Sequence, residues 1–260
     1  MVRYLIMAGR VLVLSVLALL WVSCGLILCL VRPRFKGNVY TLAQWLTICQ
    51  KVIGVKVTLE FDPQAVRSEL PAVLVGLHQS NWDIVTMAAL PQPGVVCVGK
   101  KSLLYMPIFG LMFYLSGNIA HDRSRRAKSG DSMFRMMDNI VKRRLSIWLF
   151  PEGTRSGYGP VGAFKTGALY TAMHTQVKVI PYVTSTYAGQ IDLGRWDNGE
   201  VKISLLAPLD GKSLKLEEIN SKTEQLRDSM VSALQELDAT VRRPQGYVLP
   251  VNRYEAPSPR

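Results

Sequence analysis

The chain has 260 residues, of which 48% are hydrophobic, and its formal net charge at pH 7 is +12. This length and hydrophobic content are typical of a folded domain with a sizeable core, and they argue against a largely disordered chain. The positive charge points to an anionic partner, either a nucleic acid or a membrane surface that carries acidic lipids.

The first expected element is a long apolar helix near the N-terminus. Residues 11–31 contain no charged side chain, and a helix of that length would measure about 31 Å, close to the hydrocarbon thickness of a bilayer. A cleaved signal peptide has a shorter apolar region followed by small residues, so we expect a retained membrane anchor. Residues 40–52 follow as a partly amphipathic helix. The pattern leaves open whether the anchor crosses the bilayer or enters one leaflet as half of a helical hairpin.

Two signals concern the side of the membrane on which the rest of the chain lies. Basic residues flank the apolar run on both sides, with slightly more of them after it, which favours a cytoplasmic main domain. The four cysteines have the spacing of neither a disulfide framework nor a zinc site, so we expect reduced thiols. Both signals favour the cytoplasm.

A buried strand is expected at residues 72–77, directly before His78. Ligand sites of α/β sheets lie at the carboxyl ends of the strands, which is where this pattern puts His78. Asp83 follows five residues later, in the first turn of a helix that ends near Pro91, and its carboxylate can orient the imidazole. No serine or cysteine occupies a nucleophile elbow. We therefore interpret His78 and Asp83 as a catalytic dyad for a reaction in which the substrate supplies the hydroxyl.

The next strand is expected at residues 94–98 and leads to Lys100 and Lys101. Gly94, Gly99 and Lys100 have the spacing of a phosphate-binding P-loop. That loop needs a flexible glycine-lined turn and a serine or threonine after the lysine, whereas strand-forming residues and Lys101 stand at those positions. The pattern therefore indicates a strand that ends in two lysines.

Two more polar clusters follow short expected strands. Residues 117–121 lead to the pair Asp122–Arg123, and residues 145–150 lead to a segment that contains Glu152, Gly153, Thr154 and Arg155. Glycine allows close approach of a ligand, Arg155 offers a planar fork for phosphate, and Glu152 can hold that guanidinium or a substrate hydroxyl. Each cluster alone would be interpreted as a salt bridge in a turn. Polar groups at several strand ends together predict an anion site.

The remaining pattern alternates helices and strands. Further strands are expected at 55–61, 177–183 and 201–206, and helices at 109–115, 129–144, 164–174 and within 213–241. We predict an α/β fold with a mixed sheet flanked by helices, preceded by an N-terminal membrane-embedded helix or two-helix anchor. The expected division is an anchor at residues 1–54, an α/β domain at 55–243, and a flexible, proline-containing tail at 244–260.

The positive charge is concentrated between residues 100 and 165, where twelve lysines and arginines face four acidic residues. An anchored protein meets the membrane continuously, and aromatic residues do not interleave with these cations as they do in platforms for single-stranded nucleic acid. We therefore expect anionic membrane lipids, and not nucleic acid, as the partner.

Taken together, these motifs resemble those of the bacterial 1-acyl-sn-glycerol-3-phosphate (lysophosphatidate) acyltransferases. His78 and Asp83 match the family's His-x4-Asp motif, residues 117–123 and 150–156 match its second and third motifs, and Val179-Ile180-Pro181 matches its fourth. The resemblance covers nearly the whole chain, including the apolar N-terminus. His121 departs from the pattern, because family members commonly carry an apolar residue there.

The resemblance implies transfer of an acyl group from acyl-carrier protein or coenzyme A to the 2-hydroxyl of lysophosphatidate, which yields phosphatidic acid. It implies no metal and no cofactor, since the thioester is a co-substrate, and it implies the cytoplasmic face of a bacterial inner membrane. The site residues implied are catalytic His78 and Asp83, the acceptor-binding residues Lys100, Lys101, Arg123, Glu152, Gly153, Thr154 and Arg155, and Pro181 at the acyl site.

Two alternatives remain at this point. One is an acyltransferase for another lyso-lipid, such as a lysophospholipid or a lyso-ornithine lipid. The other is a basic membrane- or nucleic-acid-binding protein without enzymatic activity, against which the intact dyad argues.

Overall fold

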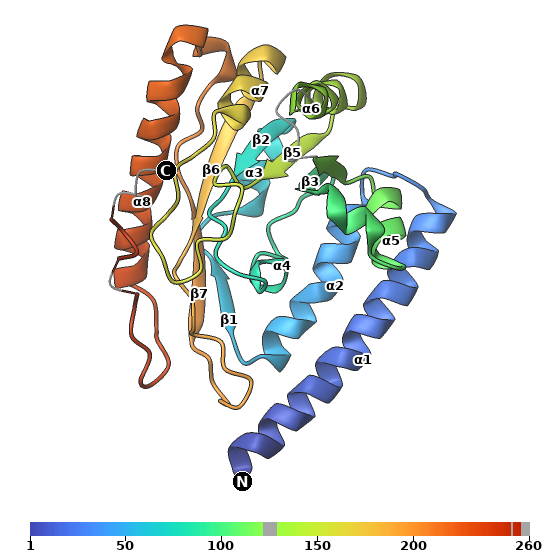
Figure 1. Ribbon diagram of the computed structural model, residues 1–260, viewed down its shortest axis with the longest axis vertical. Coiled ribbons are helices and arrows are strands. Elements are labelled where there is room, and N and C mark those ends of the chain that lie inside the picture. Colours follow the sequence, from blue (N-terminus) through green and yellow to red (C-terminus); the bar gives the residue numbers. More distant parts are fainter. Residues whose placement is uncertain (122–128, 251, 256–260) are drawn as a thin grey trace.

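The structure is a computed structural model that describes residues 1–121, 129–250 and 252–255. Its centre is a mixed sheet of seven strands in the order β1-β7-β6-β2-β5-β3-β4 (Figure 1). The strands are β1 Lys56–Leu59, β2 Ala72–Val75, β3 Val95–Lys100, β4 Ile119–His121, β5 Ser146–Leu149, β6 Lys178–Thr184 and β7 Glu200–Leu205. From β6 to β4 all neighbours are parallel, whereas β7 runs antiparallel to β6. The predicted α/β fold with a mixed sheet is confirmed.

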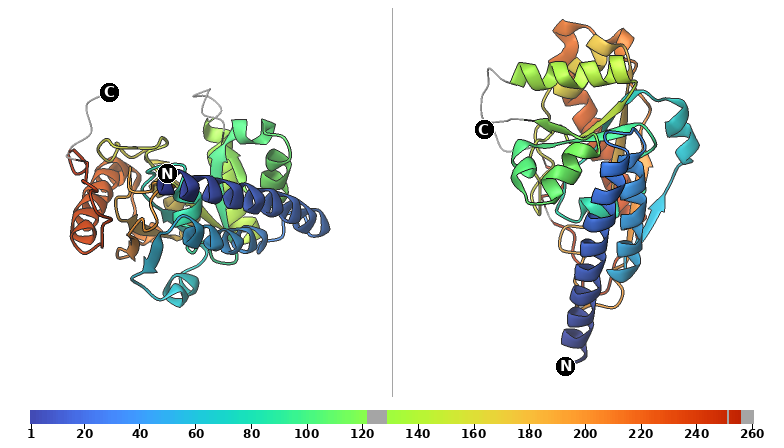
Figure 2. Two further views of the ribbon diagram at one scale, coloured as in Figure 1. Left: turned by 90° about the horizontal axis from the view of Figure 1, so that it is seen from below. Right: turned by 90° about the vertical axis from the view of Figure 1, so that its right-hand side faces the viewer.

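Helices connect the strands and cover both faces of the sheet (Figure 2). They are α1 Val2–Val31, α2 Asn38–Val52, α3 Pro63–Ser68, α4 Asp83–Thr86, α5 Phe109–Leu115, α6 Ser129–Arg143, α7 Gly167–Thr175 and α8 Ile219–Ala239. The α4 helix is one turn long, and tight turns carry the chain on to Leu90, just before the expected end at Pro91. Residues 94–100, which have P-loop spacing, form strand β3 and the turn before it.

Alternate residues of the central strand β2 enter two different cores. Val73 and Val75 belong to a cluster that includes side chains of α6, α7 and α8. Ala72 and Leu74 face the other side, in a cluster that includes Val66 of α3. This strict alternation makes the register of β2 unambiguous, because a slip by one residue would exchange the two faces. The position of His78 at the end of the strand is fixed accordingly.

The α1 helix is, within the described residues, the one helix long and apolar enough to cross a membrane by length and composition. It lies beside α2, and its first turns extend beyond the sheet (Figures 1 and 2). Polar bonds attach it to the rest of the chain along its length. Arg3 pairs with Asp192 at 3.1 Å, Arg10 donates to the Trp196 carbonyl at 2.7 Å, and the Trp21 indole donates to the Leu42 carbonyl at 2.8 Å. Most of its apolar side chains are exposed.

Within the predicted tail, residues 252–255 contact the rest of the chain. Arg253 is fully buried, and its guanidinium donates to the Ser156 hydroxyl at 2.6 Å and to the Gly159 carbonyl at 3.0 Å. These acceptors are distant from Arg253 in the sequence, so the proline pattern could not indicate them, and the flexibility of the tail at 244–260 stays a prediction. The division of the chain at residues 54 and 243 stays a prediction.

Candidate active site

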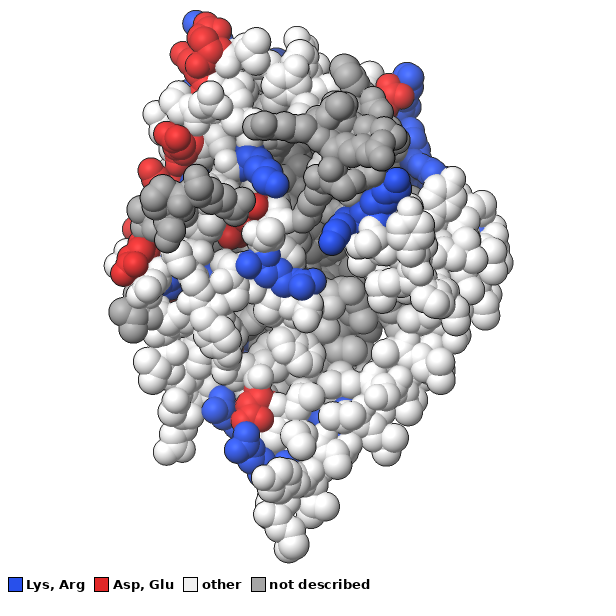
Figure 3. All heavy atoms as spheres, in the orientation of Figure 1, with Lys and Arg blue, Asp and Glu red and all other residues white. Residues whose placement is uncertain are grey.

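The carboxyl ends of β2, β3, β4 and β5 open into one pocket of about 970 Å³. His78, Lys100, His121 and Arg155 line it, each from the end of a different strand or the loop that follows. Apolar side chains of the helices form much of the remaining wall, including Trp21, Leu42, Leu46, Phe109, Met112 and Phe113. The face that carries the pocket is hollowed, and lysine or arginine side chains lie around the hollow (Figure 3). The sheet thus gathers the polar clusters that the sequence puts at its strand ends.

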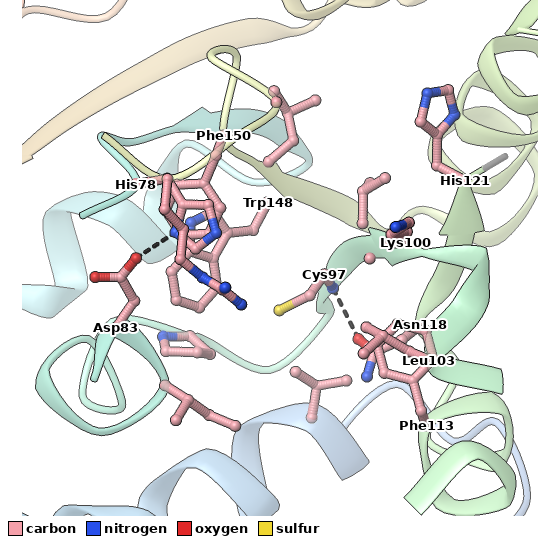
Figure 4. Close-up of a pocket in the computed structure, with 18 of the residues that line it drawn as sticks. His78, Asp83, Cys97, Lys100, Leu103, Phe113, Asn118, His121, Trp148 and Phe150 are labelled. Carbon is pink, nitrogen blue, oxygen red and sulfur yellow. Dashed lines mark hydrogen bonds and ion pairs between the residues drawn. The ribbon is translucent and has the colours of Figure 1, made fainter. Parts of the chain in front are cut away.

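The side chains of His78 and Asp83 form a hydrogen-bonded dyad in this pocket (Figure 4). Imidazole Nδ1 contacts carboxylate Oδ2, and the ring stacks on Phe150 with 4.3 Å between the ring centroids. The buried carboxylate also accepts the backbone N–H of Gln79 at 3.1 Å and the hydroxyl of Tyr187. With Nδ1 held by Asp83, Nε2 is the ring nitrogen that can take a proton from a substrate.

The loop after β5 holds the backbone of His78. The carboxylate of Glu152 accepts the His78 N–H at 2.8 Å and the Gly162 N–H at 2.9 Å. The His78 carbonyl in turn accepts the Ser156 N–H at 2.8 Å. The loop with Glu152 and Ser156 therefore holds the backbone of His78 by hydrogen bonds. This is possible because β5 is the direct neighbour of β2 in the sheet.

Glu152 lies elsewhere than the sequence analysis expects. It was expected to bind the acceptor, whereas its side chain is buried outside the pocket lining, and its two carboxylate oxygens accept backbone N–H groups. Burial raises the pKa of Glu152, and the backbone N–H groups oppose that rise. In this structure Glu152 supports the loop of His78 and does not line the pocket.

Two exposed cations lie in the pocket wall. Lys100 ends β3 and Arg155 follows β5, and neither side chain forms a hydrogen bond or ion pair with another residue in the described part of the chain. Gly153 and Thr154 line the same wall. An anionic group in the pocket can therefore be met by a planar guanidinium and an ammonium together.

Comparison with known proteins gives a consistent result. The Acyltransferase family model matches residues 57–185. The 1-acyl-sn-glycerol-3-phosphate acyltransferase of Haemophilus influenzae is 34% identical over 90% of this chain and 97% of its own length. The Escherichia coli protein of the same name is 35% identical over 89% of this chain and 94% of its own. The chain belongs to the 1-acyl-sn-glycerol-3-phosphate acyltransferase family.

A crystal structure supports the fold assignment. The 1-acyl-sn-glycerophosphate acyltransferase of Thermotoga maritima superposes with a TM-score of 0.68, covering 91% of this chain and 98% of that one at 22% identity. The family resemblance and the α/β fold expected from the sequence are thus confirmed.

Only some of the other residues named by the family resemblance lie in the pocket lining. Lys101 starts the 3-10 turn after β3 and does not line the pocket. Pro181 is buried in β6, in register with Val75, and also lies outside the pocket lining. Arg123 lies outside the described residues, so its role stays a prediction. His121, where this chain departs from the family pattern, lines the pocket in register with Lys100.

Lys165 is a pocket residue that no motif in the sequence indicates. Its ammonium lies so close to Gly153 that a Cβ there would be 2.9 Å from Nζ, and it lines the acyltransferase pocket. Gly153 has φ +72°, a left-handed conformation that favours glycine. Lys165 lies outside the four motifs that carry the family resemblance, so none of them could indicate it.

Two groups near the dyad could be mistaken for enzyme nucleophiles. Burial raises the pKa of Cys97 to about 12, so this pocket-lining thiol is neutral at physiological pH. The Ser80 hydroxyl accepts the Trp82 N–H at 3.0 Å and shapes the turn that follows His78. Both arrangements are those of structural groups, which agrees with a dyad that acts on a substrate hydroxyl.

Proposed function

We propose that this chain transfers an acyl group from an acyl thioester to the 2-hydroxyl of 1-acyl-sn-glycerol 3-phosphate and so forms phosphatidic acid. The main observation behind this proposal is the hydrogen-bonded His78–Asp83 dyad in a large, mostly apolar pocket. The exposed cations Lys100 and Arg155 line the same pocket. The names of the bacterial relatives support this substrate and this reaction.

In the proposed mechanism, His78 is the general base. Its Nε2 removes the proton of the 2-hydroxyl while the oxygen attacks the thioester carbonyl carbon, and Asp83 stabilises the imidazolium. The tetrahedral intermediate then collapses, the carbon–sulfur bond breaks, and the thiolate leaves with the proton from His78. Arg155 and Lys100 bind the phosphate of the acceptor and thereby hold its hydroxyl beside Nε2. Arg123 and Thr154 are proposed to take part in the same contact.

The acyl donor is a thioester of acyl-carrier protein or of coenzyme A. We infer that the reaction takes place at the cytoplasmic face of a bacterial inner membrane. The exposed apolar surface of α1, the four free cysteines and the bacterial relatives support that location.

The test is a thiol-release assay with the full chain in mixed micelles. Both thioesters are offered with lysophosphatidate, lysophosphatidylcholine or lyso-ornithine lipid as acceptor. We expect turnover with lysophosphatidate far above the other two, because only it presents a phosphate monoester to Arg155 and Lys100. His78→Ala should lose roughly 10²- to 10⁴-fold in kcat, the range of general-base catalysis, while His174→Ala, an exposed histidine on α7, serves as the matched control.

Two outcomes would contradict the proposal. Faster turnover with a lyso-lipid that lacks the phosphate monoester would make that lipid the substrate. Near-normal turnover by a folded His78→Ala chain would remove the dyad from the mechanism.

A further inference from the structure

The described residues near the C-terminus, 243–250 and 252–254, are called the C-terminal segment here, and they bond to two loops that both contact the dyad. One is the loop after β5, which contains Ser156, and the other is the loop after β6, which contains Thr186 and Tyr187. Its contacts with these loops are polar and partly buried, so they are directional as well as stabilising.

The first set of contacts runs from Arg253 to His78. The Arg253 guanidinium donates to the Ser156 hydroxyl at 2.6 Å, and that hydroxyl donates to the His78 carbonyl at 3.0 Å. The Ser156 N–H donates to the same carbonyl at 2.8 Å. Arg253 also donates to the Gly159 carbonyl at 3.0 Å, so it holds the loop both at Ser156 and three residues further on. The backbone of the proposed base is therefore held through a side chain at the end of the chain.

The second set of contacts runs from Tyr254 to Asp83. The Tyr254 hydroxyl donates to Asp238 at 2.8 Å, and Arg243 donates to the same carboxylate at 2.6 Å. Asp238, which is buried, accepts both the N–H and the hydroxyl of Thr186 at 2.6 Å. The next residue is Tyr187, whose hydroxyl donates to Asp83. Each half of the dyad is thus tied to the same segment.

We propose that Arg253 and Tyr254 are positioning residues for the His78–Asp83 dyad. The C-terminal segment then acts as a strap, which means that its hydrogen bonds keep the imidazole of His78 and the carboxylate of Asp83 in fixed relative positions. The proposal rests on the function proposed above. Its physical basis is that a general base acts only within hydrogen-bond reach of its proton, so displacement by about 1 Å costs up to 10²-fold in rate.

The charge of Arg253 adds a second, separable effect through Glu152. Burial is the main cause that raises the pKa of Glu152, while the N–H groups of His78 and Gly162 and the positive charges of Arg253 and protonated His78 lower it. Lys165, whose ammonium lies over Gly153, is the neighbouring cation on the pocket side. As a carboxylate, Glu152 accepts the His78 N–H. Loss of the Arg253 charge should therefore let Glu152 take up a proton at higher pH.

The experiment compares Arg253→Met with Arg253→Lys and with Arg242→Met. Arg242 is a matched control, because it lies next to Arg243 but forms a half-exposed pair with Asp197, away from the dyad. For Arg253→Met we expect kcat to fall roughly tenfold or more, with the KM of the acyl donor unchanged within about twofold. In the plot of kcat against pH, the fall in kcat on the acid side should move to higher pH, because Glu152 takes up a proton at higher pH without the Arg253 charge. Arg253→Lys should restore the pH of that fall while recovering kcat in part, because an ammonium lacks the fork.

Tyr254→Phe tests the second set of contacts, with the exposed Tyr158→Phe as control. It should lower kcat several-fold and leave both KM values unchanged. If Arg253→Met fails to fold, Ser156→Ala interrupts the first set of contacts with a smaller change and should lower kcat in the same way.

A strap that only stabilises the fold would give a different result. The melting temperature would fall, but kcat per folded chain and the pH profile would stay at wild-type values in Arg253→Met and Tyr254→Phe, and this outcome would overturn the proposal. Failure of the proposed function is recognised separately, because His78→Ala would then retain turnover. If His78→Ala is inactive while Arg253→Met keeps the wild-type kcat and pH profile, the proposed function stands and only the proposed role of the C-terminal segment is contradicted.

Discussion

The guanidinium of Arg155 lies exposed in the pocket wall, on a loop whose backbone is bonded to His78 on one side and to Arg253 on the other. Arg155→Ala should raise the KM of lysophosphatidate roughly 10- to 100-fold, the equivalent of one lost charge-assisted hydrogen bond. The KM of the acyl donor should stay within about twofold. Arg155→Lys should recover part of the loss, because it restores the charge without the bidentate geometry. Steady-state kinetics with each substrate varied in turn measures both values.

The matched control for this prediction is Arg242→Ala, which removes an arginine that pairs with Asp197 away from the pocket. An unchanged kcat/KM for lysophosphatidate in Arg155→Ala would show that the loop after β5 does not bind the acceptor phosphate.

Strand β2 delivers His78 to the pocket through Gly76, and this glycine is required by packing. A Cβ at Gly76 would overlap the ring of Tyr182, which is fully buried in β6 and accepts a hydrogen bond from the Trp148 indole. Gly76→Ala should therefore destabilise the chain by about 1–3 kcal/mol, the usual cost of overpacking. It should also lower kcat, because the strand end that carries His78 must shift. Thermal unfolding in detergent and the thiol-release assay measure the two effects.

Gly9→Ala is the control, because a Cβ at Gly9 meets no atom within 4 Å and alanine is favoured in a helix. Equal melting temperatures for Gly76→Ala and the wild type would show that the Tyr182 ring moves freely, and the packing argument would then be wrong.

At the scale of the whole molecule, the attachment of α1 favours one of the two membrane arrangements that the apolar run allows. Arg3 and Arg10 bond to Asp192 and Trp196, so the N-terminal third of α1 lies on the α/β domain, whereas Trp21 bonds to Leu42 of α2. A helix that crossed the bilayer would separate its N-terminus from that domain. We predict that α1 instead inserts its exposed apolar face into one leaflet, with both ends on the same side.

Epitope tags at residues 1 and 260, exposed to protease in sealed vesicles of known orientation, test this arrangement. Both tags should be cleaved from the same side, and cleavage from opposite sides would show that α1 spans the bilayer. Deletion of residues 1–37 should weaken membrane association without abolishing it, because apolar side chains of α2 and α5 remain exposed, including Trp45, Ile48 and Leu111. High salt should release the truncated chain more readily than the full-length one.

Short-range patterns in the sequence are sufficient for much of this description. The alternation in β2, the apolar run of α1 and the period of α6 identify elements whose structure depends on near neighbours. The dyad is local as well, since His78 and Asp83 are five residues apart and are joined by a single turn. Placement of the polar clusters at strand ends follows from the rule that α/β sheets gather their sites there.

The partners of the dyad were decided by the tertiary structure alone. Tyr187 lies 104 residues after Asp83, and Arg253 lies 97 residues after Ser156. The sequence around Glu152 does not indicate that its carboxylate accepts backbone N–H groups and does not bind a substrate. Such contacts depend on which strands are neighbours in the sheet, and the order that puts β5 and β6 on either side of β2 is set by the packing of helices on both faces. Periodicity tells which face of an element is buried, whereas only the folded chain determines what that face meets.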